Sequence, residues 1–434
     1  KSWKMELKWT DEKRKAPYGN DLYRAIFPIY YLGKLCGLVP VRFYVHASEG
    51  CRARLNVVDL VYSLCVLALL LGGEIWGLWR DLKDGWEHST RLKSETAVIA
   101  TCSDVLGVMG LTVVCIVGSP FRWKYLQLVI NKLIEVDGKI GVSRPKRARR
   151  FTICLTICSL AYLWFNSIID FYTWNGRTKN KMITDKGPIN YAPLYLMYTV
   201  IICTEIQYTV ATYNVGRRFV RLNDNLKSLL DASSGSNDNA IGYFRKFSET
   251  AAAGNDNGGK KRRNVTPKKR QLVLGSYRLS RQMDCKLESK SRNGISDLIM
   301  VHSLLCDAVS LINTTFGVVL LAVTVTCLLH LIITPYFLIL QAKASEKHEW
   351  IFLFVQAGWC IIHIARMLII VQPSYFTVTE GKRTAILVSQ LLSSATFEAD
   401  TRRELEIFSL QLLHRPLEFS ACGLFTVDRN LITS

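Results

Sequence analysis

Six long apolar stretches constrain the fold of this chain of 434 residues more than any other feature. Each runs for roughly 20 residues with few charges, which is enough for an α-helix to cross a hydrocarbon core of ~30 Å. Helices satisfy their own backbone hydrogen bonds in lipid, so the pattern predicts an all-α polytopic membrane protein with six spans. The stretches are residues 56–79, 96–119, 151–172, 191–213, 315–340 and 350–371.

Lysines and arginines are distributed unevenly between the connections of these stretches. The amino-terminal segment and the second, fourth and last connections hold 44 of the 55, whereas the first, third and fifth hold 10, and Arg366 lies inside the sixth stretch. Because Lys and Arg accumulate in cytoplasmic loops, the count predicts a cytoplasmic amino terminus. Seven-helix receptors that act through G proteins need the opposite orientation, so the count argues against that class.

The net charge of +20 follows from the same arrangement. Basic residues beside membrane spans set topology and contact anionic lipid, so we expect membrane lipid, and no nucleic acid, as a partner.

The 13 cysteines fall in the spans or on the cytoplasmic side, so no disulfide framework is expected. No metal-ligand spacing, paired carboxylates or Ser–His arrangement stands in a motif context, so we expect neither a cofactor nor an enzyme.

Composition divides the chain into five segments. A basic loop rich in Ser, Gly, Asn and Lys should be disordered, because it cannot bury enough apolar surface to offset the cost of ordering. Helical patterns continue past the inner ends of the second, fourth and fifth spans, which predicts long helices that pack together beyond the inner leaflet. The segments are 1–54 (cytoplasmic, with an amphipathic helix over 21–40), 55–231 (spans one to four), 232–275 (the basic cytoplasmic loop), 276–373 (spans five and six with a cytoplasmic extension) and 374–434 (a cytoplasmic anchor).

The amphipathic pattern over 21–40 has two interpretations. The helix either lies against the inner surface of the membrane or packs on the bundle. The sequence favours neither.

Polar and aromatic side chains gather in the outer halves of the spans. Ionisable groups at membrane depth are costly and usually face a polar cavity or a partner, so Asp104 and Asp170 are the strongest candidates for a ligand site. Hydrogen bonding between helices and an interfacial aromatic belt are the alternatives. Glu205 and Gln207 lie deeper and could form either the floor of a pocket or a packing network. The candidate residues are Asp104, Asn166, Asp170, Tyr195, Tyr198, His330, Tyr336, Gln356 and Trp359.

This mixture of side chains suits a small polyol. Carboxylates, amides and hydroxyls bind its hydroxyl groups, while an aromatic face covers its C–H surface. A neutral, well-hydrated ligand gains little net free energy per hydrogen bond, so binding on the order of millimolar, about −4 kcal/mol, is expected.

Four stretches resemble the insect gustatory receptor family and, within it, the fructose-sensing sugar receptors. The resemblance covers nearly all of the membrane part and is lost over 232–275. The matching stretches are IYYLGKLCGLVP from Ile29, VGRRFVRLN from Val215, INTTFGVVLLAVTVTCLLHLIITPYF from Ile312 and FSACGLFTVDRNLITS from Phe419.

The resemblance implies a ligand-gated cation channel of the plasma membrane. Members are homotetramers with a cytoplasmic amino terminus, and a pocket open to the outside lies among helices two to six of each subunit. The resemblance also implies a seventh, pore-lining helix, with a Thr-Tyr, five apolar residues and Gln-Phe, which the 434 residues do not contain. By position it gives the pocket role to Asp104, His330, Tyr336, Gln356 and Trp359, whereas the other four candidates, Asn166, Asp170, Tyr195 and Tyr198, follow from depth alone.

The leading hypothesis is therefore a taste receptor: a cation channel that a sugar, most specifically fructose, opens. A transporter for a small polar solute is one alternative, although the chain shows no internal symmetry of the kind that transporters carry. A metabotropic seven-helix chemoreceptor is the other, and it would need an extracellular amino terminus.

Overall fold

The computed structural model describes residues 19–46, 50–84, 95–141, 145–180, 191–234, 276–343, 350–394, 397 and 399–433. Within these residues the chain is almost wholly helical, and six helices are long and apolar enough to cross a membrane. The prediction of an all-α protein with six spans is confirmed. The six helices are α2 (Val57–Asp84), α3 (Glu95–Val117), α5 (Pro145–Asn180), α7 (Ala192–Ser234), α9 (Ser276–Lys343) and α10 (Trp350–Ser394).

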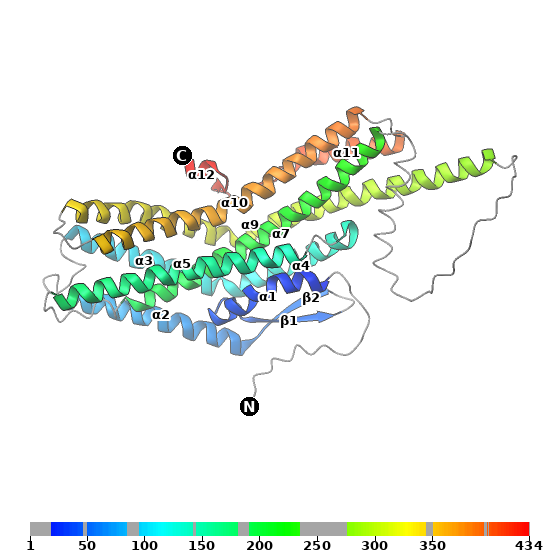
Figure 1. Ribbon diagram of the computed structural model, residues 1–434. Helices are drawn as coiled ribbons and strands as arrows, with labels where there is room; N and C mark the ends of the chain where they lie inside the picture. Colours follow the sequence, from blue (N-terminus) through cyan, green and yellow to red (C-terminus); the bar gives the residue numbers. More distant parts are fainter. Residues whose placement is uncertain are drawn as a thin grey trace, which may run out of the picture.

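Helix α7 lies at the centre of the bundle and contacts α2, α3, α5, α9 and α10 (Figure 1). In its most apolar window 83% of the residues are buried, against 22% for α2. Its sequence explains this position, because Thr204, Glu205, Thr209 and Thr212 are polar and all are buried. Glu205 and Thr209 bond to Arg366 and to the carbonyl of Ile369, both in α10. The least apolar of the six spans is thus the one that the others shield from lipid.

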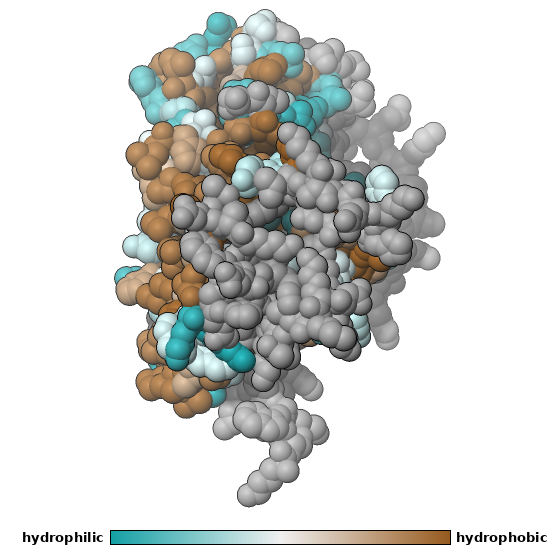
Figure 2. Space-filling model, turned by 90° about the vertical axis from the view of Figure 1, so that its left-hand side faces the viewer, coloured by the Kyte–Doolittle hydropathy of each residue, from teal (hydrophilic) through white to brown (hydrophobic). Residues whose placement is uncertain are grey.

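The periphery of the bundle exposes large apolar side chains, as lipid-facing helices should. Leu69 of α2, Ile157 of α5 and Ile332 of α9 are 76%, 61% and 72% exposed. Figure 2 views the molecule from the end at which α3, α7 and α10 begin, and hydrophobic residues, in brown, gather along the left-hand edge of this view. The connections 85–94, 181–190 and 344–349 lie outside the described residues.

The opposite end of the molecule is built from helix extensions that pack on one another. Helix α4 (Ser119–Ile140) packs on α9 through the ion pairs Lys132–Asp307 at 2.9 Å and Lys139–Asp297 at 2.8 Å, and Asp137 pairs with Arg218 of α7. Helix α11 (Ala399–His414) packs on α9 and α10. The extensions predicted from the sequence therefore do pack together.

Two boundaries differ from what the sequence suggests. The second span does not run on unbroken, because α3 ends at Val117 and α4 begins after Gly118, where Pro120 occupies the first turn. Conversely, α10 continues through Pro373 to Ser394, so the expected boundary at 374 falls inside a helix. The basic loop 232–275 lies outside the described residues from position 235 onward.

Helix α1 (Gly19–Leu35) packs on the bundle, against α5 and α7. Ile29 is 4% exposed, whereas Phe27 and Leu35 are 44% and 71% exposed, so part of its apolar surface faces outward as well. A hairpin of β1 (Val41–His46) and β2 (Gly50–Leu55) follows, with Val41 opposite Leu55. The sequence analysis did not predict these strands, although the alternation of polar and apolar residues over Val41–His46 was a signal for them.

A second, very short hairpin fixes the end of the chain to α9. It pairs β3 (Ser420–Ala421) with β4 (Phe425–Thr426), and α12 (Asn430–Thr433) follows. The side chain of Asn313 donates to the carbonyl of Glu418 at 2.9 Å and accepts from the Ser420 amide at 3.3 Å. Any side chain at Gly317 would lie 3.1 Å from the Cys422 nitrogen, so glycine permits this close approach.

Candidate functional site

Six of the nine predicted residues meet in one connected group, in the half of the bundle where α7 and α10 begin and which the sequence analysis predicts to face outward, although they come from five helices. Contacts described below join side chains of α3, α5, α7, α9 and α10. We call this group the outer cluster; its members are Asp104, Asp170, Tyr195, Tyr198, His330 and Trp359.

His330 joins three helices. Its Nδ1 lies 2.5 Å from the carbonyl oxygen of Thr326, which can only accept, so Nδ1 carries a proton. Its Nε2 therefore faces the two other partners, the Tyr198 hydroxyl at 2.7 Å and a carboxylate oxygen of Asp104. His330 is 2% exposed, whereas the Asp104 side chain is 28% exposed, so Asp104 is the part of this group nearest to solvent.

Tyr195 and Trp359 form an aromatic wall next to the second carboxylate. The Tyr195 hydroxyl donates to Asp170 at 2.8 Å, and its ring lies parallel to Trp359 with centroids 6.1 Å apart. The Tyr198 ring contacts the same Trp359 at 5.1 Å. Both carboxylates thus face groups that a hydroxylated ligand could replace, beside a flat aromatic surface.

The remaining three predicted residues lie at different places. Asn166 is 3% exposed and packs against Gly358, where any side chain would overlap its Oδ1. Gln356 is half-buried, one turn before Trp359 in α10. Tyr336 is 42% exposed and lies near the carboxy-terminal end of α9. Asn166 is therefore continuous with the outer cluster through the α5–α10 contact, whereas Tyr336 is the most exposed of the nine.

Next to the outer cluster lies a network of which the sequence analysis had considered only Glu205. Arg366 Nε and Nη2 lie 2.9 and 2.8 Å from Oε1 of Glu205, and both residues are 1% exposed. Arg366 Nη1 lies 3.4 Å from Nδ1 of His363, and the His363 ring lies 4.2 Å from that of His330. A chain of contacts therefore runs from Asp104 down to Glu205.

The structure gives different surroundings to Glu205 and Gln207, the two deeper residues whose role the sequence left open. Glu205 lies beneath the outer cluster, whereas Gln207 lies against Gly33 of α1, where a side chain would meet its Nε2 at 2.8 Å. The missed signal was a face of α10. Trp359, His363 and Arg366 follow one another at intervals of four and three residues, the spacing of one helical face.

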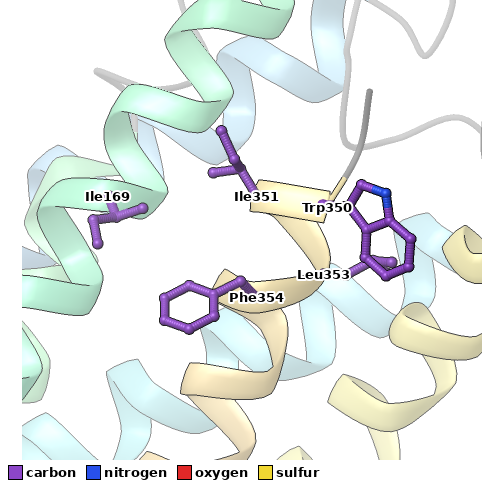
Figure 3. Close-up of a pocket in the computed structure, with 5 residues that line it drawn as sticks. All are labelled: Ile169, Trp350, Ile351, Leu353 and Phe354. Carbon is purple, nitrogen blue, oxygen red and sulfur yellow. The ribbon is translucent and has the colours of Figure 1, made fainter. Parts of the chain in front are cut away.

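An open apolar pocket of about 610 Å³ lies between α5 and the first turns of α10 (Figure 3). Its lining is Ile169, Trp350, Ile351, Leu353 and Phe354, none of which was predicted. Phe354 and Ile169 face the same space in Figure 3, while the Trp350 ring lies on the other side of α10. Such a lining suits hydrocarbon rather than a polyol, so it does not replace the outer cluster as the candidate site.

Over the ranges given above, no group of three His, Cys, Asp or Glu side chains is arranged to bind a metal ion.

The sequence profile of one protein family, described as 7tm chemosensory receptor, matches residues 26–434. The chain is 24% identical over 418 residues to the gustatory receptor for sugar taste 43a of Drosophila melanogaster, covering 94% of this chain and 93% of that one. It is also 24% identical over 327 residues to the putative gustatory receptor 28a of the same fly, covering 72% and 67% of the two chains.

Among solved structures, the chain is similar to the insect olfactory receptor OR5 from Machilis hrabei. The TM-score is 0.62 at 12% identity, and the match covers 96% of this chain and 95% of that one. The same receptor in complex with eugenol matches with a TM-score of 0.55 over the same shares. At this identity the likeness is one of fold.

Proposed function

Because this chain belongs to the 7tm chemosensory receptor family, we propose that it is a gustatory receptor: a cation channel of the plasma membrane that a sugar opens. The observation that carries the proposal is the outer cluster, in a chain whose Drosophila relative is named for sugar taste. A receptor family gives no reason to expect an enzyme.

The outer cluster offers a sugar both kinds of contact that it needs. Asp104 and Asp170 accept hydrogen bonds from hydroxyl groups, the Tyr195 and Tyr198 hydroxyls can donate or accept, and the Trp359 face covers C–H groups. In the structure these groups bond to one another. A sugar must therefore exchange contacts such as Tyr195–Asp170 for its own, which leaves a net gain below the about 0.5–1.5 kcal/mol of a hydrogen bond formed at the expense of water. An affinity on the order of millimolar follows for a ligand such as fructose.

A ligand opens a channel only if it binds the open state better than the closed one. His330 on α9 and Trp359 on α10 belong to helices that continue well past the outer cluster. The hairpin β3–β4 contacts α9 near its middle, at Asn313 and Gly317. We propose that sugar binding shifts α9 and α10 against the central α7. The cytoplasmic amino terminus, the homotetramer and the permeant cations belong to the same proposal, and the family resemblance is their support.

Whole-cell recording tests the proposal. Cells expressing the receptor are exposed to fructose, with sorbitol at equal osmolarity as the control, and surface protein is measured on the same cells. We expect an inward cation current with fructose and its loss in Trp359→Ala and Asp104→Ala at unchanged surface protein. A correctly inserted receptor that gives no current with any sugar would contradict the proposal, and normal responses in both variants would contradict the site.

Two further measurements separate the alternatives. Uptake of labelled fructose without a current would indicate a transporter. An amino-terminal epitope tag that antibody reaches on intact cells would indicate a metabotropic receptor, because the channel proposal places that tag in the cytoplasm.

A further inference from the structure

Two buried thiols meet where the end of α1 packs on the central helix α7. The sulfur of Cys36, the residue directly after α1, lies 3.6 Å from the sulfur of Cys203 in α7. The two side chains are 8% and 2% exposed, and both cysteines are free in the structure. A disulfide bond is about 2.05 Å long, so a movement of about 1.5 Å would join the two sulfurs.

The backbone around Cys36 fixes the position of this pair. The amide of Leu38 donates to the carbonyl of Gly33 at 2.7 Å, and Gly37 supplies the positive φ of 70° with which α1 ends. Gly33 lies against Gln207, one turn after Cys203 in α7. Two contacts, about one turn apart on each helix, therefore hold α1 on α7, and the thiol pair is one of them.

We propose that Cys36 and Cys203 are an oxidation site, at which a peroxide converts the two thiols into a disulfide bond that ties α1 to α7. The inference goes beyond the proposed function and does not depend on which ligand the receptor binds. It assigns this pair a reversible bond, which differs from a permanent disulfide framework.

The two thiols have different roles in this reaction. The thiol of Cys203 donates a hydrogen bond to the sulfur of Cys36, which lowers the pKa of Cys36. Because the thiolate is the nucleophile, Cys36 attacks the peroxide. Cys203 already touches the sulfur that becomes oxidised, so it is placed to complete the bond.

The reaction balances with hydrogen peroxide as the oxidant. The thiolate of Cys36 attacks one oxygen, the O–O bond breaks, and the other oxygen leaves as hydroxide, which takes up a proton to become water. Cys36 is then a sulfenic acid. The sulfur of Cys203 attacks the sulfur of Cys36, the S–O bond breaks, and a second water leaves as the disulfide forms. The two sulfurs have given two electrons to the peroxide, and small cellular thiols return them by thiol–disulfide exchange.

Disulfide mapping on the full receptor in detergent tests the proposal. The protein is treated with hydrogen peroxide, free thiols are blocked with N-ethylmaleimide, and the digest is analysed by mass spectrometry. We expect a peptide that links Cys36 to Cys203, absent without peroxide and lost after dithiothreitol. The exposed Cys422 reports whether the peroxide dose suffices.

The bond should also raise the melting temperature. It joins positions 167 residues apart and so restricts the unfolded chain, which predicts a rise of at least about 4 °C that dithiothreitol reverses. Cys203→Ser should abolish the rise and leave a sulfenic acid at Cys36 that dimedone traps. The matched control is Cys154→Ser, which removes one of two thiols 3.9 Å apart within α5 and should keep the rise.

Each outcome bears on the inference. Oxidised Cys422 in a digest where Cys36 and Cys203 stay unlinked would overturn it, and so would a melting temperature that peroxide raises equally in Cys203→Ser. If that variant does not fold, the digest and the melting shift of the wild-type receptor decide. A linked peptide in a receptor that gives no current with any sugar would contradict the proposed function and support the oxidation site.

Discussion

The substitution Gly358→Ala, which adds one methyl group, tests the packing of the candidate site most directly. The glycine lets α10 approach α5, and the space where its side chain would be holds the carboxamide of Asn166, whose Cγ lies 3.0 Å from the ideal Cβ position. Gly107 of α3 is the matched control. It also lies in a span, and its Cβ would meet Leu329 and Thr326 at an ordinary 3.6 Å.

The comparison isolates the steric cost. Alanine is favoured over glycine in a helix by about 1 kcal/mol, and this gain is common to both variants. Overpacking a filled site typically costs about 1–3 kcal/mol, and only Gly358→Ala incurs it. The two variants should therefore differ in stability by about 1–3 kcal/mol, with Gly107→Ala equal to or above the wild type.

The assay is the apparent melting temperature of detergent-solubilised receptor, followed by fluorescence-detected gel filtration. At about 2 °C per kcal/mol, the lower end of the range for folded domains, Gly358→Ala should melt at least about 2 °C below Gly107→Ala. Adding Asn166→Ala removes the carboxamide, so the double variant should show a favourable coupling of about 0.5–3 kcal/mol. Equal melting of the two glycine variants would refute the α5–α10 contact as described.

Three other outcomes are expected from the same structure. Arg366→Met leaves a buried carboxylate without its partner and should destabilise the receptor by about 3–5 kcal/mol, whereas Glu205→Leu with Arg366→Met should recover most of the melting temperature; a double variant as unstable as the single would argue against the ion pair. Tyr195→Phe removes the donor to Asp170 and should lower stability by about 1–3 kcal/mol as well as shift the half-maximal fructose concentration, and unchanged values for both would dissociate that bond from the site. Asn313→Ala removes both bonds to the hairpin β3–β4, so limited proteolysis should cleave near residue 420 faster than in the wild type, and an unchanged rate would contradict that docking.

The sequence sufficed for the spans because length and apolarity alone decide whether a helix can cross a membrane. The resemblance to insect gustatory receptors is likewise confirmed at the level of the family. In the candidate site, Asp104 and Asp170 were selected because charged groups at membrane depth are rare enough to stand out. Their partners follow only from which helix faces which, and that information is spread over segments far apart in the chain.

What the sequence analysis missed has a physical cause in each case. In the sequence analysis Arg366 was noted only as the one basic residue inside a span, and His363 was not considered. The role of both residues depends on Glu205, which lies across the α7–α10 contact. The first hairpin was missed because Arg42 and Arg54, paired opposite each other, were read as topology signals rather than as parts of alternating strands. The break at Gly118 was available from Pro120 and was overlooked in favour of the continuing helical pattern.

The pairing of Glu205 with Arg366 has a consequence for how the protein is made. The two residues are 161 positions apart, so the ribosome has finished α7 long before α10 exists. A charged residue at the centre of a span costs about 2.5–3.5 kcal/mol on insertion scales. Glu205 therefore destabilises the inserted α7 by about this amount until Arg366 of α10 pairs with it. The central helix α7 thus reaches its final packing only after α10 has been made, although it is synthesised earlier. The ion pair can form only after α10 has been synthesised and has docked on α7.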